Sequence, residues 1–291
     1  MIATTVDIPR IPRSHSRAIG GILVERGRLT PNDVDQIKRF ANERGLRFGD
    51  AAVMLKLLEQ DDVDSALAQQ FDYPMLARGG EGGVADEVIA GYDPQSAVVE
   101  GLRALRSRIT LRWLNTANRK ILAVTSAERG DGRSWLAANL AVVFAQTGER
   151  TLLIDADMRH PRQHQLFNLS NTVGLSALLT GRAGKGTLRR IHRGLRLFVL
   201  TAGSLPPNPQ ELLGRPAFDL MLNRFAQRFD VVLLDTPPAT ETADAQILAA
   251  RAGAAIMLTR RNHTRHACLT AAAQSFAQTG VNIIGSVINE H

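Results

Sequence analysis

Between residues 121 and 289 the chain alternates apolar runs of strand length with segments of helical pattern, and this alternation limits the fold more than any other feature. The runs are ILAVTS (121–126), TLLID (151–155), LRLFVLT (195–201), DVVLLD (230–235), AAIMLT (254–259) and NIIGSVIN (282–289). Continuous apolar strands separated by helices are typical of a mainly parallel sheet that is covered on both faces. We therefore expect a doubly wound α/β domain, with ligand sites at the carboxyl ends of its strands.

The loop after the first of these strands has the pattern of a phosphate-binding loop. AERGDGRSWLAAN contains the glycines and the serine of that pattern, but Arg133 stands where the pattern has lysine. A helical pattern follows over residues 135–148. Backbone N–H groups and the helix dipole favour a polyanion at such a point, so we expect a P-loop nucleotide site. Its candidate residues are Glu128, Arg129, Gly130, Asp131, Gly132, Arg133, Ser134 and Trp135.

Three aspartates follow two of the expected strands. Asp155 and Asp157 close the run LLIDAD, and Asp235 closes VVLLD. One isolated aspartate at a strand end is more often structural, but three of them beside a phosphate-binding loop favour a functional site. Mg²⁺ prefers oxygen ligands and keeps several waters, so the Ser134 hydroxyl, phosphate oxygens and nearby carboxylates suit it. A carboxylate that does not meet the metal is available to accept a proton from an attacking hydroxyl group.

The net charge of +7 comes almost wholly from arginine. Of 35 Lys and Arg residues, only Lys38, Lys56, Lys120 and Lys185 are lysines. Arg133 therefore reflects either this bias or a site rebuilt around a guanidinium group. Two basic clusters either meet acidic lipid or an acidic partner, or are simply solvated: Arg189, Arg190, Arg193 and Arg196, and then Arg260, Arg261 and Arg265. Nucleic acid is not expected as a partner, because no basic stretch is interleaved with aromatic residues.

No stretch of the sequence predicts export or a membrane span. The N-terminus lacks the apolar run of a signal peptide, and no segment approaches the roughly 18 apolar residues of a spanning helix. Cys268 is the only cysteine, which excludes an intrachain disulfide. We expect a cytoplasmic protein whose association with a membrane comes through a partner or its surface charge.

A glycine-rich stretch divides the chain. RGGEGGVADEVIAGYDP has four glycines in five positions, which is typical of a linker, and we place the linker at residues 78–94. The expected organisation is a helical domain at 18–77, this linker, and an α/β nucleotide-binding domain at 95–291.

The helical domain contains an internal repeat with a period of 29 residues, in which Gly20 corresponds to Gly49 and Val34 to Val63. Each copy has the pattern of a helix pair. In the first copy, Thr30-Pro31-Asn32-Asp33 predicts a capped helix start with proline at the first helical position.

This domain resembles the N-terminal domain of type II secretion ATPases, in the version that binds cyclic di-GMP. The second copy supplies most of the motif and has Lys56 where the family has glycine. The resemblance implies a cyclic di-GMP site formed by Arg47, Phe48, Gly49, Leu58 and Gln70. The alternative is a docking module in which the apolar residues of this set are simply core.

The α/β domain resembles the bacterial tyrosine kinases. LLIDADMR (152–159) and VVLLDTPP (231–238) match their second and third nucleotide motifs, and TAGSLPPNPQELL (201–213) matches a further stretch of those kinases. Glu100, Arg103 and Arg106 resemble the motif by which those kinases pack into rings. With its N-terminal domain, the chain looks most like the EpsG-type kinases that accompany exopolysaccharide chain-length determinants.

The resemblance implies an ATP-dependent protein tyrosine kinase that uses Mg²⁺ and forms a homo-oligomer. It places Asp155 near the nucleophile, Asp157 and Asp235 in the metal shell, and Asn289 near the adenine. The implied partner is a membrane-embedded chain-length determinant, a polysaccharide co-polymerase. Through this partner the chain is expected to lie peripherally at the inner membrane.

Two departures from the family leave the function open between two hypotheses. Arg133 replaces the lysine, and the related kinases end in a tyrosine cluster, whereas the tyrosines of this chain are Tyr73 and Tyr92. The first hypothesis is a kinase that acts on a partner or on Tyr92; the second is a nucleotide-gated assembly partner of the co-polymerase, with slow or no chemistry. A partition or septum-site ATPase is less favoured, because such proteins carry a lysine at the position of Glu128.

Overall fold

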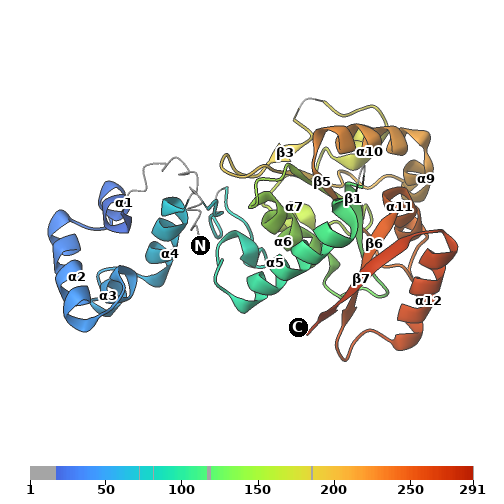
Figure 1. Cartoon of the computed structure of the whole chain (residues 1–291). Helices are drawn as coiled ribbons and strands as arrows, with labels where there is room; N and C mark the ends of the chain where they lie inside the picture. Colours follow the sequence, from blue (N-terminus) through green and yellow to red (C-terminus); the bar gives the residue numbers. More distant parts are fainter. Residues whose placement is uncertain (1–17, 72, 81, 117–118, 185, 291) are drawn as a thin grey trace, which may run out of the picture. The chain divides into compact units, whose positions relative to one another are not determined.

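The computed structural model describes residues 18–71, 73–80, 82–116, 119–184 and 186–290 (Figure 1). Its contacts divide the chain into two units, Met1–Met75 and Leu76–His291. The described part of the first unit is helical, whereas the second contains a seven-stranded sheet with helices on both of its faces.

Four helices form the N-terminal unit: α1 (Ile19–Glu25), α2 (Pro31–Arg44), α3 (Phe48–Met54) and α4 (Gln60–Gln70). The predicted start of α2 is confirmed, because Thr30 Oγ1 accepts from Asp33 N at 3.2 Å and Asp33 Oδ2 accepts from Thr30 N at 2.7 Å. Helix α1 packs on α4 and α2 packs on α3. Their shared core contains Ile22, Leu23, Ile37, Ala51 and Ala66, all almost inaccessible to solvent.

The internal repeat is visible in the packing of this unit. A Cβ atom added at Gly49 would lie 2.5 Å from Val63 Cγ1, and one added at Gly20 would lie 3.0 Å from Val34 Cγ1. Gly27, in the turn between α1 and α2, has a φ of 69°. Lys56, its counterpart 29 residues later in the turn between α3 and α4, has a φ of 55°. The two copies therefore share a backbone turn that only the first fills with glycine.

The sheet of the second unit has the order β3-β4-β2-β5-β1-β6-β7. Its strands are β1 (Ile121–Ser126), β2 (Thr151–Asp155), β3 (Arg189–Arg190), β4 (Leu197–Leu200), β5 (Val231–Asp235), β6 (Ala254–Arg260) and β7 (Asn282–Asn289). All adjacent pairs are parallel except β3 and β4. The predicted α/β fold and its six strands are confirmed, while β3, an antiparallel edge strand of two arginines, was not predicted.

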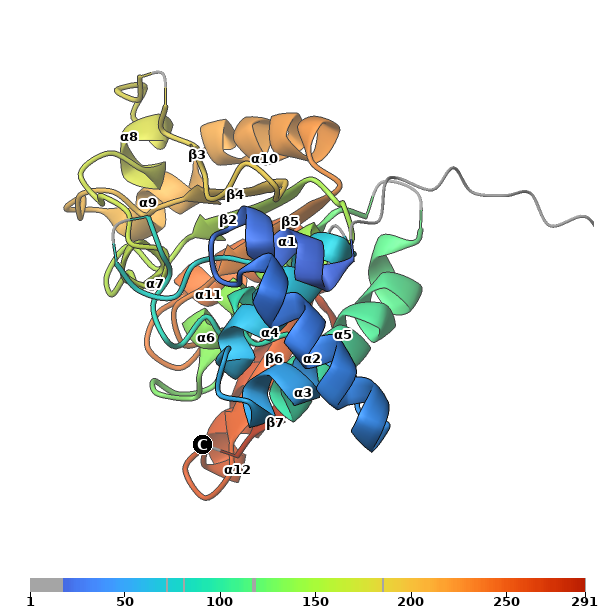
Figure 2. The ribbon, with the colours of Figure 1, turned by 90° about the vertical axis from the view of Figure 1, so that its left-hand side faces the viewer.

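Helices cover both faces of this sheet, as the doubly wound pattern predicts. One core cluster contains Leu122 and Val124 of β1 and packs against α5 (Ala97–Ile109) and α6 (Arg133–Ala145). The intervening Ala123 belongs to the other cluster, on the face of α9 (Pro209–Gly214), α10 (Pro216–Arg228), α11 (Asp244–Ala252) and α12 (His266–Gln278). Helix α10 lies beside β5 (Figure 2).

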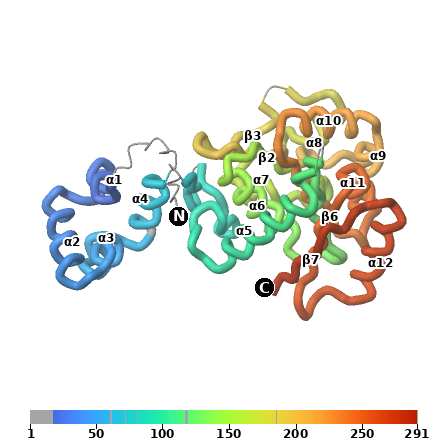
Figure 3. Tube along the Cα trace, viewed as in Figure 1, coloured from blue at the N-terminus to red at the C-terminus, as the bar shows by residue number. Residues whose placement is uncertain are grey.

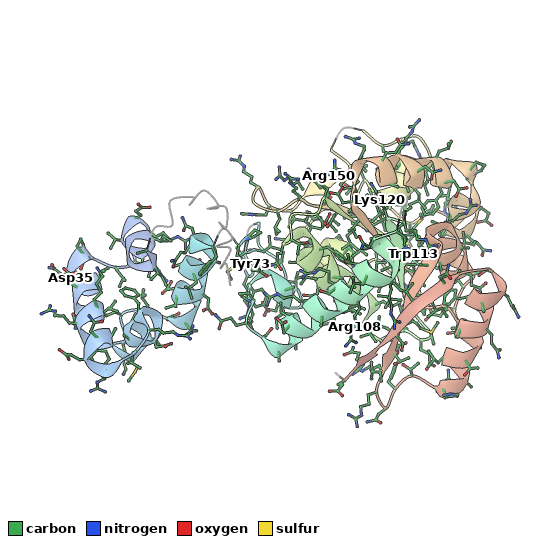
Figure 4. The ribbon with its side chains drawn as sticks, in the orientation of Figure 1. Asp35, Tyr73, Arg108, Trp113, Lys120 and Arg150 are labelled. Carbon is green, nitrogen blue, oxygen red and sulfur yellow. The ribbon has the colours of Figure 1, made fainter. Side chains whose placement is uncertain are left out.

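Shorter helical pieces complete this unit: η1 (Ile89–Gly91), η2 (Thr110–Leu114), α7 (Gln163–Leu166) and α8 (Leu175–Leu179). The π-helical turn η2 ends α5 against the sheet, because Trp113 is buried and its Nε1 donates to Ile121 O at 3.0 Å. Figure 4 labels Trp113 together with Arg108 of α5 and with Lys120 and Arg150, which precede β1 and β2. Within the described ranges, no helix has the length and apolar character that crossing a bilayer requires.

Residues 76–80 and 82–92, which we call the strap, pack on α6 instead of forming the predicted linker at 78–94 (Figure 3). Leu76, Val84, Val88 and Ala90 are buried in the core of the second unit. The side chain of Asn139 on α6 accepts from Ala90 N and donates to Glu87 O, each at 2.9 Å. The linker prediction is therefore wrong over most of its length.

The glycines that suggested a linker instead build a tight turn within the strap. Gly79, Gly80 and Gly82 all have positive φ angles, and Gly79 N donates to Val84 O at 2.8 Å. Glycine reaches such conformations without steric cost. The boundary between the units accordingly lies at residues 75 and 76, not at the start of α5.

Candidate active site

The loop between β1 and α6 borders a cavity of about 340 Å³ at the carboxyl edge of the sheet. Gly130 and Gly132 have φ angles of 85° and 101°, and Gly132 is the N-cap of α6. The loop therefore takes a path that favours glycine at both positions. The cavity is lined by Glu87, Arg129, Gly130, Gly132, Arg133, Ser134, Trp135, Asp157, His160, Arg162 and Leu166.

Arg133 is the first residue of α6, and its guanidinium is bound by three oxygens of its own chain. Nε donates to Thr236 O at 2.9 Å, and Nη1 donates to Ser126 Oγ at 2.7 Å and to Glu128 O at 2.9 Å. Its side chain joins the ends of β1 and β5 to the loop. Burial lowers the pKa of Arg133, while the charge of Asp235 raises it. Because these acceptors match a planar fork and not an ammonium, the geometry favours a site rebuilt around arginine.

Asp155 and Asp235 end the adjacent strands β2 and β5, and they face each other in the register of the sheet. Both are fully buried. Burial first, and then the charge of Asp235, holds the pKa of Asp155 well above its usual range. Burial likewise raises the pKa of Asp235 to about 6, although a hydrogen bond from Gln163 opposes this change. Burial and the proximity of the two carboxyl groups thus disfavour the charged form of both.

Asp157 is the carboxylate of this set that lines the cavity, whereas Asp155 and Asp235 do not line it. Its Oδ1 accepts from the backbone N of Arg159 at 3.2 Å and from that of His160 at 2.9 Å. Asp155 Oδ2 accepts from the backbone N of Arg162 at 3.0 Å. The resemblance placed Asp155 near the nucleophile, but in this structure the Asp155 side chain is buried and does not face the cavity, so its role stays a prediction.

The residues at the strand ends fit a magnesium ion that is also bound by phosphate. In the described part of the chain, Asp155 Oδ1 and Asp235 Oδ1 are buried and have no hydrogen-bond partner. Ser134 also lines the cavity, and its side chain lowers the pKa of Asp235. The described residues contain no group of three His, Cys, Asp or Glu side chains able to hold a metal alone. Mg²⁺ needs no such cage, because it usually binds one or two carboxylates together with waters and substrate phosphates.

The loop after β6 braces the phosphate-binding loop. Arg265 binds the Glu128 carboxylate through its backbone N at 2.7 Å and its guanidinium at 2.7 and 2.9 Å. Thr264 Oγ1 donates to the buried Asp131 at 2.6 Å, and His263 Nε2 lies 3.1 Å from Arg129 O. The second basic cluster is therefore not simply a solvated face. The side chains of Glu128 and Asp131, two predicted nucleotide-site residues, do not line the cavity but serve this brace.

Asn289 lies at the end of β7, against the same loop. Its Nδ2 donates to Asp131 O at 3.1 Å, and a Cβ atom added at Gly132 would lie 2.6 Å from that nitrogen. Asn289 and Trp135 also line a second cavity of about 440 Å³ between α5 and β7. The position of Asn289 near an adenine stays a prediction, which its place between the loop and this cavity supports.

The residues of the expected ring-packing motif lie on α5. Arg103 Nη1 pairs with Glu100 Oε2 at 3.1 Å, one helical turn away, and Arg106 Nη1 donates to Val143 O at 3.0 Å. Arg106 is thus in part committed to its own domain. The role of these three residues in an oligomer stays a prediction.

The candidate cyclic di-GMP residues of the N-terminal unit are only partly available to a ligand. Leu58 is buried in the helical core, and Gly49 is packed against Val63. Arg47, by contrast, is exposed immediately before α3, and Gln70 is the last residue of α4. The packing of Leu58 and Gly49 favours the core alternative for these two positions.

Several residues at the site were not predicted. Gln163 joins the two buried aspartates, Thr264 and Arg265 hold the loop, and Glu87 of the strap lines the cavity and pairs with Arg162 at 3.4 Å. These residues lie outside the strand-end motifs, and no spacing in the sequence connects them to the loop. The basic cluster at 260–265 was the one available signal.

Comparisons with known proteins agree with this geometry. Over residues 117–291 the chain matches the ParA family model, described as NUBPL iron-transfer P-loop NTPase. Tyrosine-protein kinase YwqD of Bacillus subtilis (strain 168) is 36% identical over 202 residues, which cover 69% of this chain and 85% of that protein. The chain belongs to the bacterial tyrosine-kinase family. The recognition and the enzyme class expected from the motifs are confirmed.

Two solved structures of this tyrosine-kinase family are similar as well. The kinase domain of the Escherichia coli tyrosine kinase Etk superposes with a TM-score of 0.68 at 31% identity, covering 73% of this chain and 82% of that one. The chimerical protein CapA2B2 gives a TM-score of 0.67 at 30% identity, covering 78% of this chain and 99% of that one. The resemblance of residues 18–77 to secretion ATPases is not addressed by these similarities and stays a prediction.

Proposed function

We propose that this protein transfers the γ-phosphoryl group of ATP to a tyrosine of a partner protein and so regulates exopolysaccharide production and export. The loop at 127–132 lies at the N-terminus of α6, next to a cavity that is also lined by two carboxylates and three arginines: Glu87, Asp157, Arg129, Arg133 and Arg162. Phosphoryl transfer depends mainly on such positioning and electrostatic stabilisation.

In the proposed reaction, the tyrosine oxygen forms a bond to the γ-phosphorus as the bond from that phosphorus to the bridging oxygen of ADP breaks. Asp157 lines the cavity and accepts the tyrosine proton. Ser134, Asp155 and Asp235 would hold the magnesium ion, and the Ser134 side chain lowers the pKa of Asp235. This proposal exchanges the roles that the resemblance implied for Asp155 and Asp157. Mg²⁺ held by these residues would supply positive charge beside the phosphate groups of the nucleotide.

The observation that carries this proposal is the cavity in which the P-loop and Asp157 meet, in a chain of the tyrosine-kinase family. The test is transfer of labelled γ-phosphate by the full-length protein, alone and with the cytoplasmic segment of the membrane partner. Asp157→Asn should abolish transfer and retain nucleotide binding. A wild-type protein that binds ATP·Mg²⁺ but labels no tyrosine in either arm contradicts the proposal.

The second candidate function is a nucleotide-gated assembly partner with slow or no chemistry. It is favoured by the three hydrogen bonds that hold the Arg133 guanidinium on protein oxygens. The Arg133 guanidinium would have to break these hydrogen bonds before it could stabilise the charge on a phosphoryl group during transfer. In this case nucleotide binding alone would change the affinity of the chain for the co-polymerase, with the same result for ATP and for a non-hydrolysable analogue.

The acceptor tyrosine is proposed to lie on another protein. The Tyr92 hydroxyl donates to Asp86 O at 2.5 Å, and Arg78 stacks over its ring at 5.0 Å. Burial raises the pKa of Tyr92, which further reduces the share of reactive phenolate. Modification of Tyr92 would first require that the strap open, so the partner is the better substrate.

The proposed setting is the cytoplasmic face of the inner membrane, reached through a membrane-embedded chain-length determinant. The similarity to CapA2B2, a chimerical protein, supports a partner of this kind. We also propose a homo-oligomer assembled through Glu100, Arg103 and Arg106, and adenine binding beside Asn289. Cyclic di-GMP, if it binds, would meet Arg47, Phe48 and Gln70 on the N-terminal unit; titration of the full-length protein with cyclic di-GMP tests this.

A further inference from the structure

Gln163 connects three parts of the candidate site although it belongs to none of the motifs. It is fully buried at the start of α7. Its backbone N donates to Asp155 Oδ2 at 2.9 Å. Its side-chain Nε2 donates to Asp235 Oδ2 at 2.7 Å and to Ser134 O, in the first turn of α6, at 3.0 Å. One residue thus touches the ends of β2 and β5 and the helix that follows the P-loop.

The two carboxylates that Gln163 contacts are close together and buried, so hydrogen bonds from Gln163 stabilise them. Asp155 and Asp235 are buried neighbours in the sheet, so their charges repel each other in a medium that screens them weakly. Each accepts a hydrogen bond from Gln163 through Oδ2. Within the described part of the chain, Oδ1 of each has no hydrogen-bond partner. Gln163 Nε2 donates both to Asp235 Oδ2 and to Ser134 O. This second bond fixes the position of the donor, which in turn restricts the rotation of the Asp235 carboxylate.

A role in packing alone does not account for the choice of glutamine. The Oε1 atom of Gln163 is buried and also lacks a hydrogen-bond partner among the described residues. An unsatisfied buried carbonyl oxygen is costly, and an apolar side chain of the same length would avoid that cost. What the amide supplies, and an apolar side chain does not, is the pair of N–H donors to Asp235 and Ser134.

We infer that Gln163 is a positioning residue of the phosphotransfer site, which orients the carboxylates of Asp155 and Asp235 so that one oxygen of each remains for a divalent cation. It acts through these two side chains and has no contact with nucleotide or substrate in this arrangement. The inference rests on the proposed function in one respect: it assumes that a divalent cation binds at this site together with the nucleotide.

The test compares Gln163→Met with Gln165→Met in the full-length protein. Met has nearly the length of Gln but no donor, and Gln165 is an exposed residue of the same helix. Mn²⁺ serves as the probe, measured by electron paramagnetic resonance in the presence of ADP, and metal-free ADP binding is measured by calorimetry. Gln163→Asn, which keeps the amide but is one methylene shorter, is the second variant in case the Met variant does not fold.

Gln163→Met should weaken Mn²⁺ binding to the ADP complex by about 10- to 100-fold, the usual range for residues that orient metal ligands. Metal-free ADP affinity should stay within about twofold, Gln163→Asn should show an intermediate loss, and Gln165→Met should resemble the wild type. A folded Gln163 variant that binds Mn²⁺ within twofold of the wild type overturns the inference. So does an equal loss of ADP affinity with and without metal, which a merely structural role predicts.

These measurements test the role of Gln163 separately from the proposed kinase activity. If the wild type transfers no phosphate but binds Mn²⁺ with ADP, and the Met variant loses the metal, the kinase proposal fails while the role of Gln163 stands. If the wild type binds ADP but no Mn²⁺ under these conditions, the role of Gln163 is rejected, whatever the phosphotransfer assay shows.

Discussion

Arg133 Nη1 and Ser126 Oγ are 2.7 Å apart, so the residue in the lysine position of the P-loop is tied to the last residue of β1. The same guanidinium reaches Thr236 O, directly after β5. Two adjacent strands and the loop between β1 and α6 are thus joined by one side chain before any ligand arrives. This arrangement makes Arg133 part of the architecture of the loop as well as a candidate for phosphate binding.

Arg133→Lys should therefore lower both stability and phosphotransfer. An ammonium group does not reach three acceptors spread over a planar fork, and losing a hydrogen bond from a charged group costs about 2 kcal/mol. We expect that loss in urea unfolding, with a clear fall in labelled γ-phosphate transfer. Arg129→Lys is the control, because its partly exposed pair with Glu241 should be worth less than about 1 kcal/mol. A lysine variant that is as stable and more active would mean that composition alone put arginine there.

Lys56→Gly should stabilise the N-terminal unit. Lys56 has a φ of 55°, a left-handed conformation that costs a non-glycine residue about 1 kcal/mol. Glycine stands at the equivalent position of the first repeat, Gly27. Amide hydrogen exchange of α2 and α4 in the full-length protein should slow about fivefold. Lys38→Gly, within α2, should accelerate the same exchange; if both variants accelerate it, the left-handed conformation is not a source of strain.

Asp235→Asn should stabilise the metal-free protein at pH 8 but not at pH 4. Burial raises the pKa of Asp235 in the folded protein to about 6, above the value of about 4 that is usual for an aspartate, so the favourable contribution of its protonated form is complete below about pH 4 and is lost as the pH rises through 6. The difference corresponds to at most about 3 kcal/mol. Thermal unfolding across this pH range measures it. Added Mg²⁺ and ADP should reverse the order, since the wild type then regains a partner for its carboxylate.

Asp230→Asn provides a control of opposite sign. The Arg150 hydrogen bond and charge hold the pKa of Asp230 below its usual range, so this residue stabilises the folded state above that range and loses the effect as the pH falls. The variant should be less stable than the wild type at pH 8. Equal behaviour of the two Asn variants would contradict both assignments.

Asn139→Ala should loosen the strap without unfolding the sheet. The substitution leaves Ala90 N and Glu87 O without their partner on α6, and each unsatisfied buried group costs about 1–3 kcal/mol. Exchange of the amides at residues 84–91 should accelerate at least tenfold relative to those of β1. Asn171→Ala, which loses its bonds to Gly203 instead, should leave strap exchange unchanged.

Arg103→Glu should dissociate the proposed homo-oligomer while ATP affinity stays within a few fold. If Arg103 meets a neighbouring subunit, the reversed charge repels what it previously attracted. Sedimentation of the variant reads out its mass. Arg108→Glu makes the same charge change on the same helix, outside the motif, and should keep the oligomer. An unchanged mass for Arg103→Glu would leave the pair with Glu100 as a contact within one chain only.

The sequence was sufficient for the sheet because its signal is local. Each buried strand is a continuous apolar run, and Asp155 and Asp235 mark the ends of two of them, so their proximity follows from parallel topology alone. The helix start at Thr30 is local in the same way, since a cap and its partner lie three residues apart. Short-range patterns of this kind are read reliably from one chain.

The contacts that were missed connect residues far apart in the chain. Thr264 meets Asp131 and Arg265 meets Glu128 across more than 130 positions, and nothing in either segment specifies the other. The strap was mistaken for a linker because glycine serves a flexible spacer and a tight turn equally well. Its apolar residues, among them Leu76, Val84 and Val88, follow neither the helical nor the strand period, and only the complementary surface of α6 reveals their role.

The strap also fixes where this chain can be recombined with others. A hybrid joined at residue 95 would leave the apolar side of α6 bare and Asn139 without the two backbone groups it holds. A hybrid joined at residue 75 would carry the whole catalytic fold intact. Exchange of N-terminal units among related proteins, in nature or in the laboratory, should therefore join the two parts at the first residue of the strap and not at the start of α5.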